Sequence, residues 1–249
     1  MKKNTNVDII DVAIKAGVSP ATVSRSFNHP NKVLKSTQKR IEKAILQTGY
    51  IRNRAAQAIQ GKRSGTVGLI VPTLDNAIFS NLIQAFSVEI RKHGFTMLVA
   101  TNGYDLDDEY TLLRSLLEHR VEGVALIGHD HSKETYNLLN IRNVPVVSMW
   151  NYKEDSLISC VGGENKEAGI EIAKHISSLG HTKIAMAFPN VEDNDRARDR
   201  KIGVLEYLNS QDISIPEYWD IKTEYSVSDA RNCAEELFNK YPHPTAIIA

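Results

Sequence analysis

Hydrogen-bonding side chains are concentrated between residues 19 and 28, in the stretch SPATVSRSFN. Ser19 can cap a helix there, with the ring of the next residue at the first helical position, where a missing N–H costs nothing. On such a helix Val23 and Phe27 lie four residues apart and point inward. The outer face is left to Pro20, Ala21, Thr22, Ser24 and Arg25. The surface that meets this face must be polar.

Charge is divided unevenly along the chain. Over all 249 residues, 30 Lys and Arg balance 30 Asp and Glu. Residues 1–64 contain 13 Lys and Arg but only 3 Asp and Glu, a net charge of +10, so residues 65–249 carry −10. Basic side chains that neutralise phosphates gain affinity by releasing counterions. The first segment therefore suits a polyanion, and the larger segment does not.

Short helices position the polar face within this basic segment. Asp8 can cap a first helix that Gly17 ends, and a third helix is predicted over residues 36–48 with Ser36 as its cap. Two short helices joined by a Gly-containing turn, the second exposing Thr and Arg, form the helix-turn-helix of major-groove readers. The sequence therefore predicts that the polar face contacts DNA.

From residue 66 onward, short apolar runs alternate with helical patterns. The predicted strands are TVGLIV, FTMLVA, VEGVALIG, PVVSMW, ISCVGG, KIAMAF, DIKTEY and TAIIA. Helices are predicted between them over about residues 77–93, 107–119, 132–141, 166–179, 197–209 and 227–239. This alternation is typical of right-handed βαβ units on a mostly parallel sheet with helices on both faces.

Several function classes find little support. No stretch approaches the roughly 18 uninterrupted apolar residues of a membrane helix, and the basic start lacks the apolar core of a signal peptide, so a cytoplasmic location is expected. The motifs GxGxxG, GxxxxGK[ST], HExxH and GxSxG are absent, so no enzyme is expected. Cys160 and Cys233 have no metal-ligand spacing, and the HDH run at residues 129–131 lacks a distant third ligand. Neither a metal nor a cofactor is expected.

Stretches across the whole chain resemble the LacI/GalR family of bacterial transcription regulators. They are DVAIKAGVSPATVSRSFN, TGYIRNRAAQAIQ, TVGLIVPTLDNAIFSNLI, GGENKEAG and RDRKIG, and PTLDNAIF and GGENKEAG are most similar to the gluconate-repressor branch. The resemblance implies a small all-α helix-turn-helix domain over residues 1–50, then a hinge helix and linker over 51–64. It also implies an α/β core over 65–249, with two lobes of parallel sheet like those of periplasmic sugar-binding proteins.

The boundary between the two lobes is expected near residue 162. The N-lobe would span about residues 65–162 and the C-lobe about 163–249. Family members continue past a strand such as TAIIA, so the resemblance implies that the C-terminal part of the core is missing from this sequence.

The resemblance assigns DNA contacts to the second helix. Pro20 and Ala21 occupy the variable positions at its start, where the Ala21 methyl can contact thymine, and Arg25 can form two hydrogen bonds to guanine. The remaining polar residues are expected to position the protein on phosphates: Ser19, Thr22, Ser24 and Asn28.

Residues 53–60 match the hinge helix of the family. Asn53 and Arg54 are expected to contact DNA there, and Ile59 replaces the leucine that enters a minor-groove base step as an apolar wedge. Arg52 stands where many members have proline, and it adds a phosphate contact. Because eight residues are too few for a stable isolated helix, the hinge is expected to fold upon DNA.

Ligands of two-lobed folds bind between the lobes, at the carboxyl ends of parallel strands. The loops expected there carry eight candidate effector-binding residues: Thr73, Asn76, Phe79, His129, Trp150, Asn151, Arg196 and Arg200. Arg200 matches the arginine with which family members hold sugar hydroxyls or carboxylates, although a surface ion pair is the alternative. Phe79 and Trp150 suit stacking on a sugar face, although core packing would account for either residue.

The sequence as a whole predicts a sequence-specific transcription regulator, most simply a repressor, whose operator affinity depends on a small sugar or sugar acid. As a homodimer it would bind a near-palindromic operator. Two alternatives stay open: a sugar-binding protein without gene regulation, and a sugar-processing enzyme on the same kind of sheet.

Overall fold

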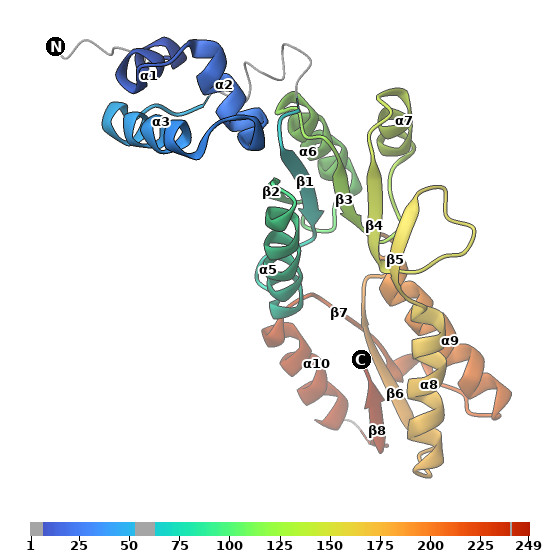
Figure 1. Ribbon diagram of the computed structural model, residues 1–249. Helices are drawn as coiled ribbons and strands as arrows, with labels where there is room; N and C mark the ends of the chain where they lie inside the picture. The colour runs from blue at the N-terminus through green and yellow to red at the C-terminus, as the bar shows by residue number, and fades with distance from the viewer. Residues whose placement is uncertain (1–6, 53–62, 240) are drawn as a thin grey trace. The chain divides into compact units, whose positions relative to one another are not determined.

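The computed structural model describes residues 7–52, 63–239 and 241–249 (Figure 1). The chain forms two compact units, Met1–Arg63 and Ser64–Ala249, and each is described by itself. Within the described residues, no helix is both long and apolar enough to cross a membrane.

The first unit is helical throughout its described part. Its elements are α1 (Ile9–Ala16), α2 (Pro20–Asn28), the 3-10 turn η1 (Pro30–Lys32) and α3 (Lys35–Thr48). A capping box begins α1, because the Asp8 carboxylate accepts from the Asp11 N–H while the Asp11 carboxylate accepts from the Asp8 N–H. Gly17 ends α1 in the left-handed conformation, with φ 62°.

The start of α3 differs from the prediction. Leu34 occupies the N-cap position without any side-chain hydrogen bond. The Gln38 N–H donates to the Leu34 carbonyl at 2.9 Å, so the helix has already begun before Ser36. The prediction that Ser36 caps this helix is therefore wrong.

A small apolar core joins the three helices of the first unit. Its buried residues are Val12, Ala13, Ala16, Val23, Ile41 and Ala44. Val23 of α2 is fully buried, which contributes roughly 1.5–3 kcal/mol, and Phe27 packs against the same cluster. One side of α2 is therefore fixed inward, as predicted, and the other side is left outward.

The first sheet of the second unit is parallel, with strand order β2–β1–β3–β4–β5. Its strands are β1 (Thr66–Val71), β2 (Thr96–Thr101), β3 (Val124–Ile127), β4 (Val146–Asn151) and β5 (Ser159–Gly163). The helices packed on it are α5 (Ala77–Lys92), α6 (Leu106–Glu118) and α7 (Lys133–Ile141).

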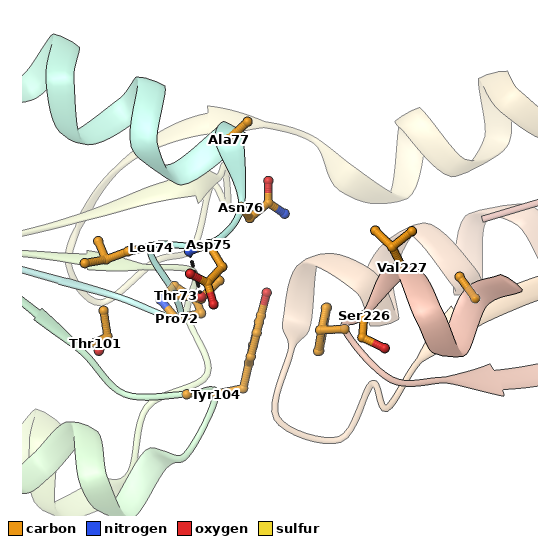
Figure 2. A pocket seen from close by; sticks show the side chains of 13 residues that line it. Pro72, Thr73, Leu74, Asp75, Asn76, Ala77, Thr101, Tyr104, Ser226 and Val227 are labelled. Carbon is orange, nitrogen blue, oxygen red and sulfur yellow. Dashed lines mark hydrogen bonds between the residues drawn. The ribbon is translucent and has the colours of Figure 1, made fainter. Parts of the chain in front are cut away.

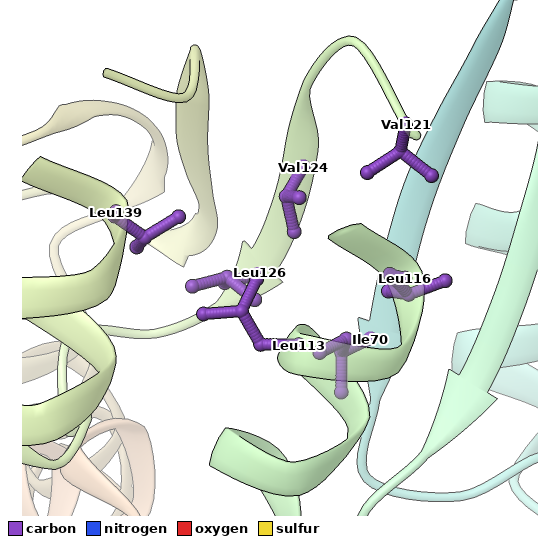
Figure 3. Packing of buried hydrophobic residues seen from close by; sticks show 7 residues of the cluster. All are labelled: Ile70, Leu113, Leu116, Val121, Val124, Leu126 and Leu139. Atoms are coloured by element: carbon purple, nitrogen blue, oxygen red, sulfur yellow. The ribbon is translucent and has the colours of Figure 1, made fainter. Parts of the chain in front are cut away.

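Successive side chains of each strand point to opposite faces of this sheet. On one face, Leu113 and Leu116 of α6 and Leu139 of α7 pack on Ile70 and Leu126 (Figure 3). The opposite face packs against α5 through the neighbouring strand positions, in a cluster that includes Leu69, Val71, Phe79, Ala125 and Ile127. Burial on both faces accounts for the continuous apolar runs in the sequence.

The second sheet is also parallel, with strand order β7–β6–β8. Its elements are α8 (Asn165–Ser178), β6 (Ile184–Pro189), α9 (Asp195–Ser210), η2 (Glu217–Trp219), β7 (Asp220–Thr223), α10 (Val227–Asn239) and β8 (Ala246–Ile248). Ala173 of α8 and Val204 and Leu208 of α9 share a core cluster with Ile184 and Met186 of β6. The predicted alternation of strands and helices is confirmed.

Two glycines allow α8 and α9 to meet backbone to backbone. A Cβ atom on Gly169 would lie 2.1 Å from the Arg200 carbonyl oxygen, and one on Gly203 would lie 2.0 Å from the Lys166 carbonyl oxygen. Any side chain at either position would force the helices apart. This contact fixes where the first turns of α9 stand.

Strand order reverses within each sheet. From β1 the chain moves outward to β2 and then back across to β3, and in the second sheet β7 and β8 lie on opposite sides of β6. Such a reversal leaves a crevice at the carboxyl ends of the strands, where ligands bind in open α/β sheets. Of the predicted ligand-binding residues, Thr73, Asn76 and His129 lie in loops at these ends, and Trp150 and Asn151 end β4. Phe79 lies instead in α5, and Arg196 and Arg200 lie in α9.

Candidate functional site

The start of α2 is held by hydroxyl groups. The Ser19 Oγ accepts from the Thr22 N–H at 3.2 Å and lies 2.9 Å from the Thr22 hydroxyl oxygen, while Pro20 occupies the first turn. These bonds satisfy a backbone donor that the helix itself leaves unpaired. Both hydroxyl oxygens also retain lone pairs and stay at the accessible end of the helix.

The outer side of α2 carries the other predicted DNA contacts. Pro20, Ala21, Arg25 and Asn28 are exposed, and Ser24 is half-buried. Neither a hydrogen bond nor an ion pair joins the Arg25 guanidinium to any other described residue, so its donors face solvent. Asn53, Arg54 and Ile59 lie outside the described residues.

A cavity of about 920 Å³ opens at the carboxyl ends of β1 and β2 in the second unit. The predicted residues Thr73 and Asn76 line it, together with Asp75 and Tyr104 (Figure 2). Its opposite wall comes from the segment after β7, which contributes Tyr225, Ser226 and Val227. Residues from both sheets therefore meet at one cleft.

A stacked tyrosine pair crosses this cleft. The rings of Tyr104 and Tyr225 lie parallel within 5°, with centroids 4.0 Å apart. Asn194 donates from its side-chain amide to the Tyr225 hydroxyl. Burial raises the pKa of Tyr104 to about 12, and the neighbouring Tyr225 adds to this shift. Burial also raises the pKa of Tyr225, so both phenols are neutral at physiological pH.

Sequence reasoning missed both tyrosines. Tyr104 lies four residues beyond the predicted strand FTMLVA, and Tyr225 ends the predicted strand DIKTEY, so each stands at the carboxyl end of a strand, and this was the available signal. The two positions are remote in sequence, and only the arrangement of the two sheets brings them together.

Phe79 and Trp150 pack on each other rather than facing this cavity. Their ring centroids are 5.5 Å apart, and Phe79 belongs to the core beneath α5. Trp150 has a positive φ of 82° and lines a second cavity, of about 410 Å³, with Gly163 and Asn165. Core packing therefore accounts for Phe79, while Trp150 keeps contact with a cavity.

Asn151 and Asp195 form the centre of a buried polar network. The Asn151 side-chain amide donates to Asp195 at 2.8 Å and to Asp199 at 3.0 Å, and its oxygen accepts from Asn165 at 2.9 Å. The His129 N–H donates to Asp195 at 2.8 Å. Because Asn151 is the last residue of β4 and Asp195 begins α9, the network joins the first sheet to the helix that packs on the second.

Arg196 is buried in the same network. Its guanidinium donates to the Ile127 carbonyl at 3.1 Å and to the Asp195 carboxylate at 2.8 Å. Gly128, with φ 80°, makes room for it, because a Cβ there would lie 2.1 Å from the Arg196 Nη1. These contacts hold the start of α9 against the end of β3.

Arg200 lies one turn further along α9. Its Nη1 donates to the Asn165 side-chain oxygen at 2.6 Å. Burial lowers the pKa of Arg200, and the nearby positive charge of Arg196 lowers it further. Two guanidinium groups therefore stand close together at this end of α9, which favours a negatively charged or oxygen-rich neighbour.

The HDH run directs its three side chains to three different partners. The His129 Nε2 lies 3.0 Å from the Asn151 carbonyl oxygen, and Asp130 accepts two hydrogen bonds from Arg198 at 2.7 and 2.8 Å. The His131 Nδ1 lies 2.9 Å from the Glu109 carboxylate. In the part of the chain that the structure describes, no group of three His, Cys, Asp or Glu residues is arranged to hold a metal ion.

The predicted ligand-binding residues thus fall into separate groups. Thr73 and Asn76 line the larger cavity, and Trp150 lines the smaller one. His129, Asn151 and Arg196 are hydrogen-bonded within the network between the sheets.

Comparisons with known proteins divide the chain at the same place as its structure. Residues 8–53 match the family model described as bacterial regulatory proteins, lacI family. Residues 64–249 match the model described as periplasmic binding proteins and sugar binding domain of LacI family.

Curated relatives are similar over most of the chain. The HTH-type transcriptional regulator GntR of Escherichia coli K12 is 31% identical over 185 residues, which cover 74% of this chain and 56% of the relative. The sucrose operon repressor of Lactococcus lactis subsp. lactis is 30% identical, covering 86% of this chain and 68% of the relative. The chain therefore spans little more than half the length of GntR.

Solved structures share the fold of this chain. A LacI-family transcriptional regulator from Silicibacter pomeroyi superimposes with a TM-score of 0.83 at 24% identity, over 97% of this chain and 72% of that one. The lac repressor dimer bound to operator and the anti-inducer ONPF gives a TM-score of 0.81 at 25% identity, over 98% and 73%.

Proposed function

The chain belongs to the lacI family of bacterial regulatory proteins, and from this premise we propose that it is a sequence-specific DNA-binding transcription regulator, acting as a repressor. Its affinity for an operator would be controlled by a small sugar or sugar acid bound in the cleft of the second unit. The relatives named above are transcription regulators, and one of them was solved on operator DNA.

The observation that carries the proposal is the outer side of α2. A buried Val23 and a capped start fix this helix in its unit, while Ala21, Arg25 and Asn28 stay exposed. The surrounding segment is strongly basic. A rigid helix that presents such groups from a basic domain can read base edges in the major groove while nearby hydroxyls contact phosphates.

The lining of the 920 Å³ cavity supports a polyhydroxylated ligand. Thr73, Asp75, Asn76 and Ser226 offer hydrogen-bonding groups, and Tyr104 offers an aromatic face. Carbohydrates combine hydroxyl edges with apolar ring faces, so they match both kinds of wall. Guanidinium groups pair with carboxylates, so Arg196 and Arg200 in the first turns of α9 extend the proposal from sugars to sugar acids.

The proposed regulator acts as a homodimer in the cytoplasm. Two copies of α2 would enter successive major-groove turns of a symmetric operator. Asn53, Arg54 and Ile59 stay part of this proposal as contacts from the connecting segment. The ligand and the operator would influence each other's affinity by the same factor, because coupling between two sites is reciprocal.

Selection from a pool of random DNA duplexes tests the proposal directly. The purified chain is bound at physiological salt, and the retained duplexes are sequenced. A symmetric motif is the expected result. Retention without a motif, lost steeply as salt rises, would mean that the basic segment binds DNA only as a polyanion.

The recovered operator then allows ligands to be screened. Sugars and sugar acids are added to the complex, and the operator affinity is measured for each. A ligand that binds the chain without altering operator affinity would favour the alternative of a sugar-binding protein without gene regulation. Turnover of such a ligand would favour the enzyme alternative.

A further inference from the structure

Arg52, at the end of the described part of the first unit, contacts the last turn of α2. We propose that Arg52 is a positioning residue for base reading, because it holds the side-chain amide of Asn28, for which the sequence predicted a phosphate contact, in an orientation suited to a base edge at the end of the exposed face of α2. This inference rests on the proposed DNA-reading role of α2, and it adds to that role a residue that lies outside the helix. Sequence analysis predicted only a phosphate contact for Arg52.

Two contacts fix the Arg52 guanidinium on α2. Its Nη2 donates a hydrogen bond to the Asn28 side-chain oxygen, across 24 positions of sequence. The guanidinium carbon also lies 5.1 Å from the ring centroid of Phe27, which is cation–π geometry. Phe27 in turn contacts Tyr50, with ring centroids 6.4 Å apart. These contacts hold the Arg52 side chain against the last turn of α2.

The hydrogen bond selects one orientation of the Asn28 amide. A guanidinium has only donors, so the amide must turn its oxygen toward Arg52 and its NH2 group away. The NH2 group lies 3.4 Å from the Ser24 Oγ, one turn back along α2. Asn28 thus presents donors along the same side of the helix as Ser24, where phosphate and base acceptors are expected.

Arg52 also lies in line with the reading face, which we define as Ala21, Ser24, Arg25 and Asn28. Residues three and four apart share one side of a helix, so these positions form a single row. The guanidinium stands at the C-terminal end of this row, where a positive charge complements the helix dipole. Arg52 therefore stabilises the end of α2 that the N-terminal cap cannot reach.

A lysine at position 52 could not make both of these contacts with Phe27 and Asn28. The planar fork of arginine can stack on Phe27 while one nitrogen bonds Asn28, whereas a lysine ammonium is a compact point charge. The comparison of Arg52→Lys with Arg52→Ala therefore separates geometry from charge.

The test measures affinity for the selected operator and for a scrambled duplex, each across a salt series. The variants are Arg52→Ala, Arg52→Lys, Asn28→Ala and the double variant Asn28→Ala/Arg52→Ala. Lys39→Ala is the matched control, because it removes one exposed positive charge from α3. Thermal unfolding of every variant is followed in parallel.

We expect Arg52→Ala and Arg52→Lys to lower operator affinity about tenfold, as expected for loss of a charge-assisted hydrogen bond. Affinity for the scrambled duplex should change no more than in Lys39→Ala, and Arg52→Lys should leave the salt slope unchanged. Adding Arg52→Ala to Asn28→Ala should cost little more than Asn28→Ala alone, since Arg52 acts through Asn28. A purely structural role would not produce this pattern of coupling.

Three results would overturn the inference. Equal losses on operator and scrambled DNA, with full rescue by lysine, would make Arg52 a simple phosphate contact. Additive losses in the double variant would mean that Arg52 does not act through Asn28, and unchanged operator affinity would remove its role altogether. If the wild-type chain shows no sequence preference, the proposed function fails first and the positioning role fails with it.

Discussion

Arg25 is the side chain of α2 that is expected to recognise a base directly. Its guanidinium is exposed at the middle of α2 and is bonded to no other described residue. An arginine in the major groove can donate two hydrogen bonds to one guanine, which discriminates against other bases by about 1–3 kcal/mol.

Replacing Arg25 by alanine should therefore weaken operator binding about tenfold or more, with a much smaller loss on scrambled DNA. Competition between the two duplexes measures the difference. Lys43→Ala, which removes an exposed charge from α3, is the control and should weaken both duplexes alike. Equal losses for Arg25→Ala on both duplexes would remove its base-reading role.

Tyr104 allows a prediction about pH. Burial raises its pKa to about 12, whereas the unfolded chain titrates near the ordinary value of 10. Between these values the folded state keeps a proton that the unfolded state has lost, so the free energy of unfolding must fall as pH rises through this range. The stabilising effect is fully present below pH 10.

The prediction is checked by following phenolate absorbance during alkaline titration. Tyr104→Phe should remove a phenol that ionises near pH 12 and should leave stability less dependent on pH between about 10 and 12. Tyr136, whose pKa burial also raises to about 12, remains in the variant and provides the internal comparison. Ionisation of Tyr104 near pH 10 would mean that the stacked pair is open in solution.

Residue-scale features were only partly predictable from sequence. The polar side of α2 followed from the spacing of Val23 and Phe27, because one helix is enough to define two faces. The tyrosine pair could not be predicted, because each partner belongs to a different sheet and neither strand pattern specifies how the sheets meet. The contact of Arg52 with Asn28 was missed because the two residues are 24 positions apart and the helical pattern does not specify where the chain after α3 returns to α2.

At the scale of elements, the contact between α8 and α9 is the tightest helix contact described. Gly169 and Gly203 place the two backbones in direct contact, with no room for a methyl group. The sequence indicated both helices but not their contact, since a glycine inside a helical pattern has several explanations. Strand positions were most predictable for β1 and β3, because their continuous apolar runs are buried on two faces.

Gly203→Ala should lower the free energy of unfolding by about 1–3 kcal/mol, even though alanine is the better helix former. Urea denaturation measures the change. Gly163→Ala is a matched control, because nothing lies within 4 Å of a Cβ added there, and it should change stability by less than about 0.5 kcal/mol. A stabilised Gly203→Ala variant would mean that the helices are further apart than described.

At the scale of the second unit, one carboxylate organises the junction of the two sheets. Asp195 is 3% exposed and accepts hydrogen bonds from His129, Asn151 and Arg196. Loss of this acceptor would leave the buried guanidinium without its negative partner. Removing one member of a buried ion pair costs far more than the pair contributes.

Asp195→Ala should therefore destabilise the chain by about 3–5 kcal/mol. Asp193→Ala, at an exposed position two residues earlier, should have an effect within about 0.5 kcal/mol. Denaturation followed by circular dichroism compares the two variants. Similar stabilities would mean that the network contributes little to holding the sheets together.

The placement of the two tryptophans gives the protein an optical reporter of its own. Trp150 lines the 410 Å³ cavity beside the start of α8, whereas Trp219 is 5% exposed in a core cluster with Leu237 of α10. The fluorescence of Trp150 should respond to a change in that cavity while Trp219 supplies a steady reference. A Trp219→Phe variant would leave Trp150 as the single tryptophan, so that occupancy of the 410 Å³ cavity could be followed in real time without any attached dye.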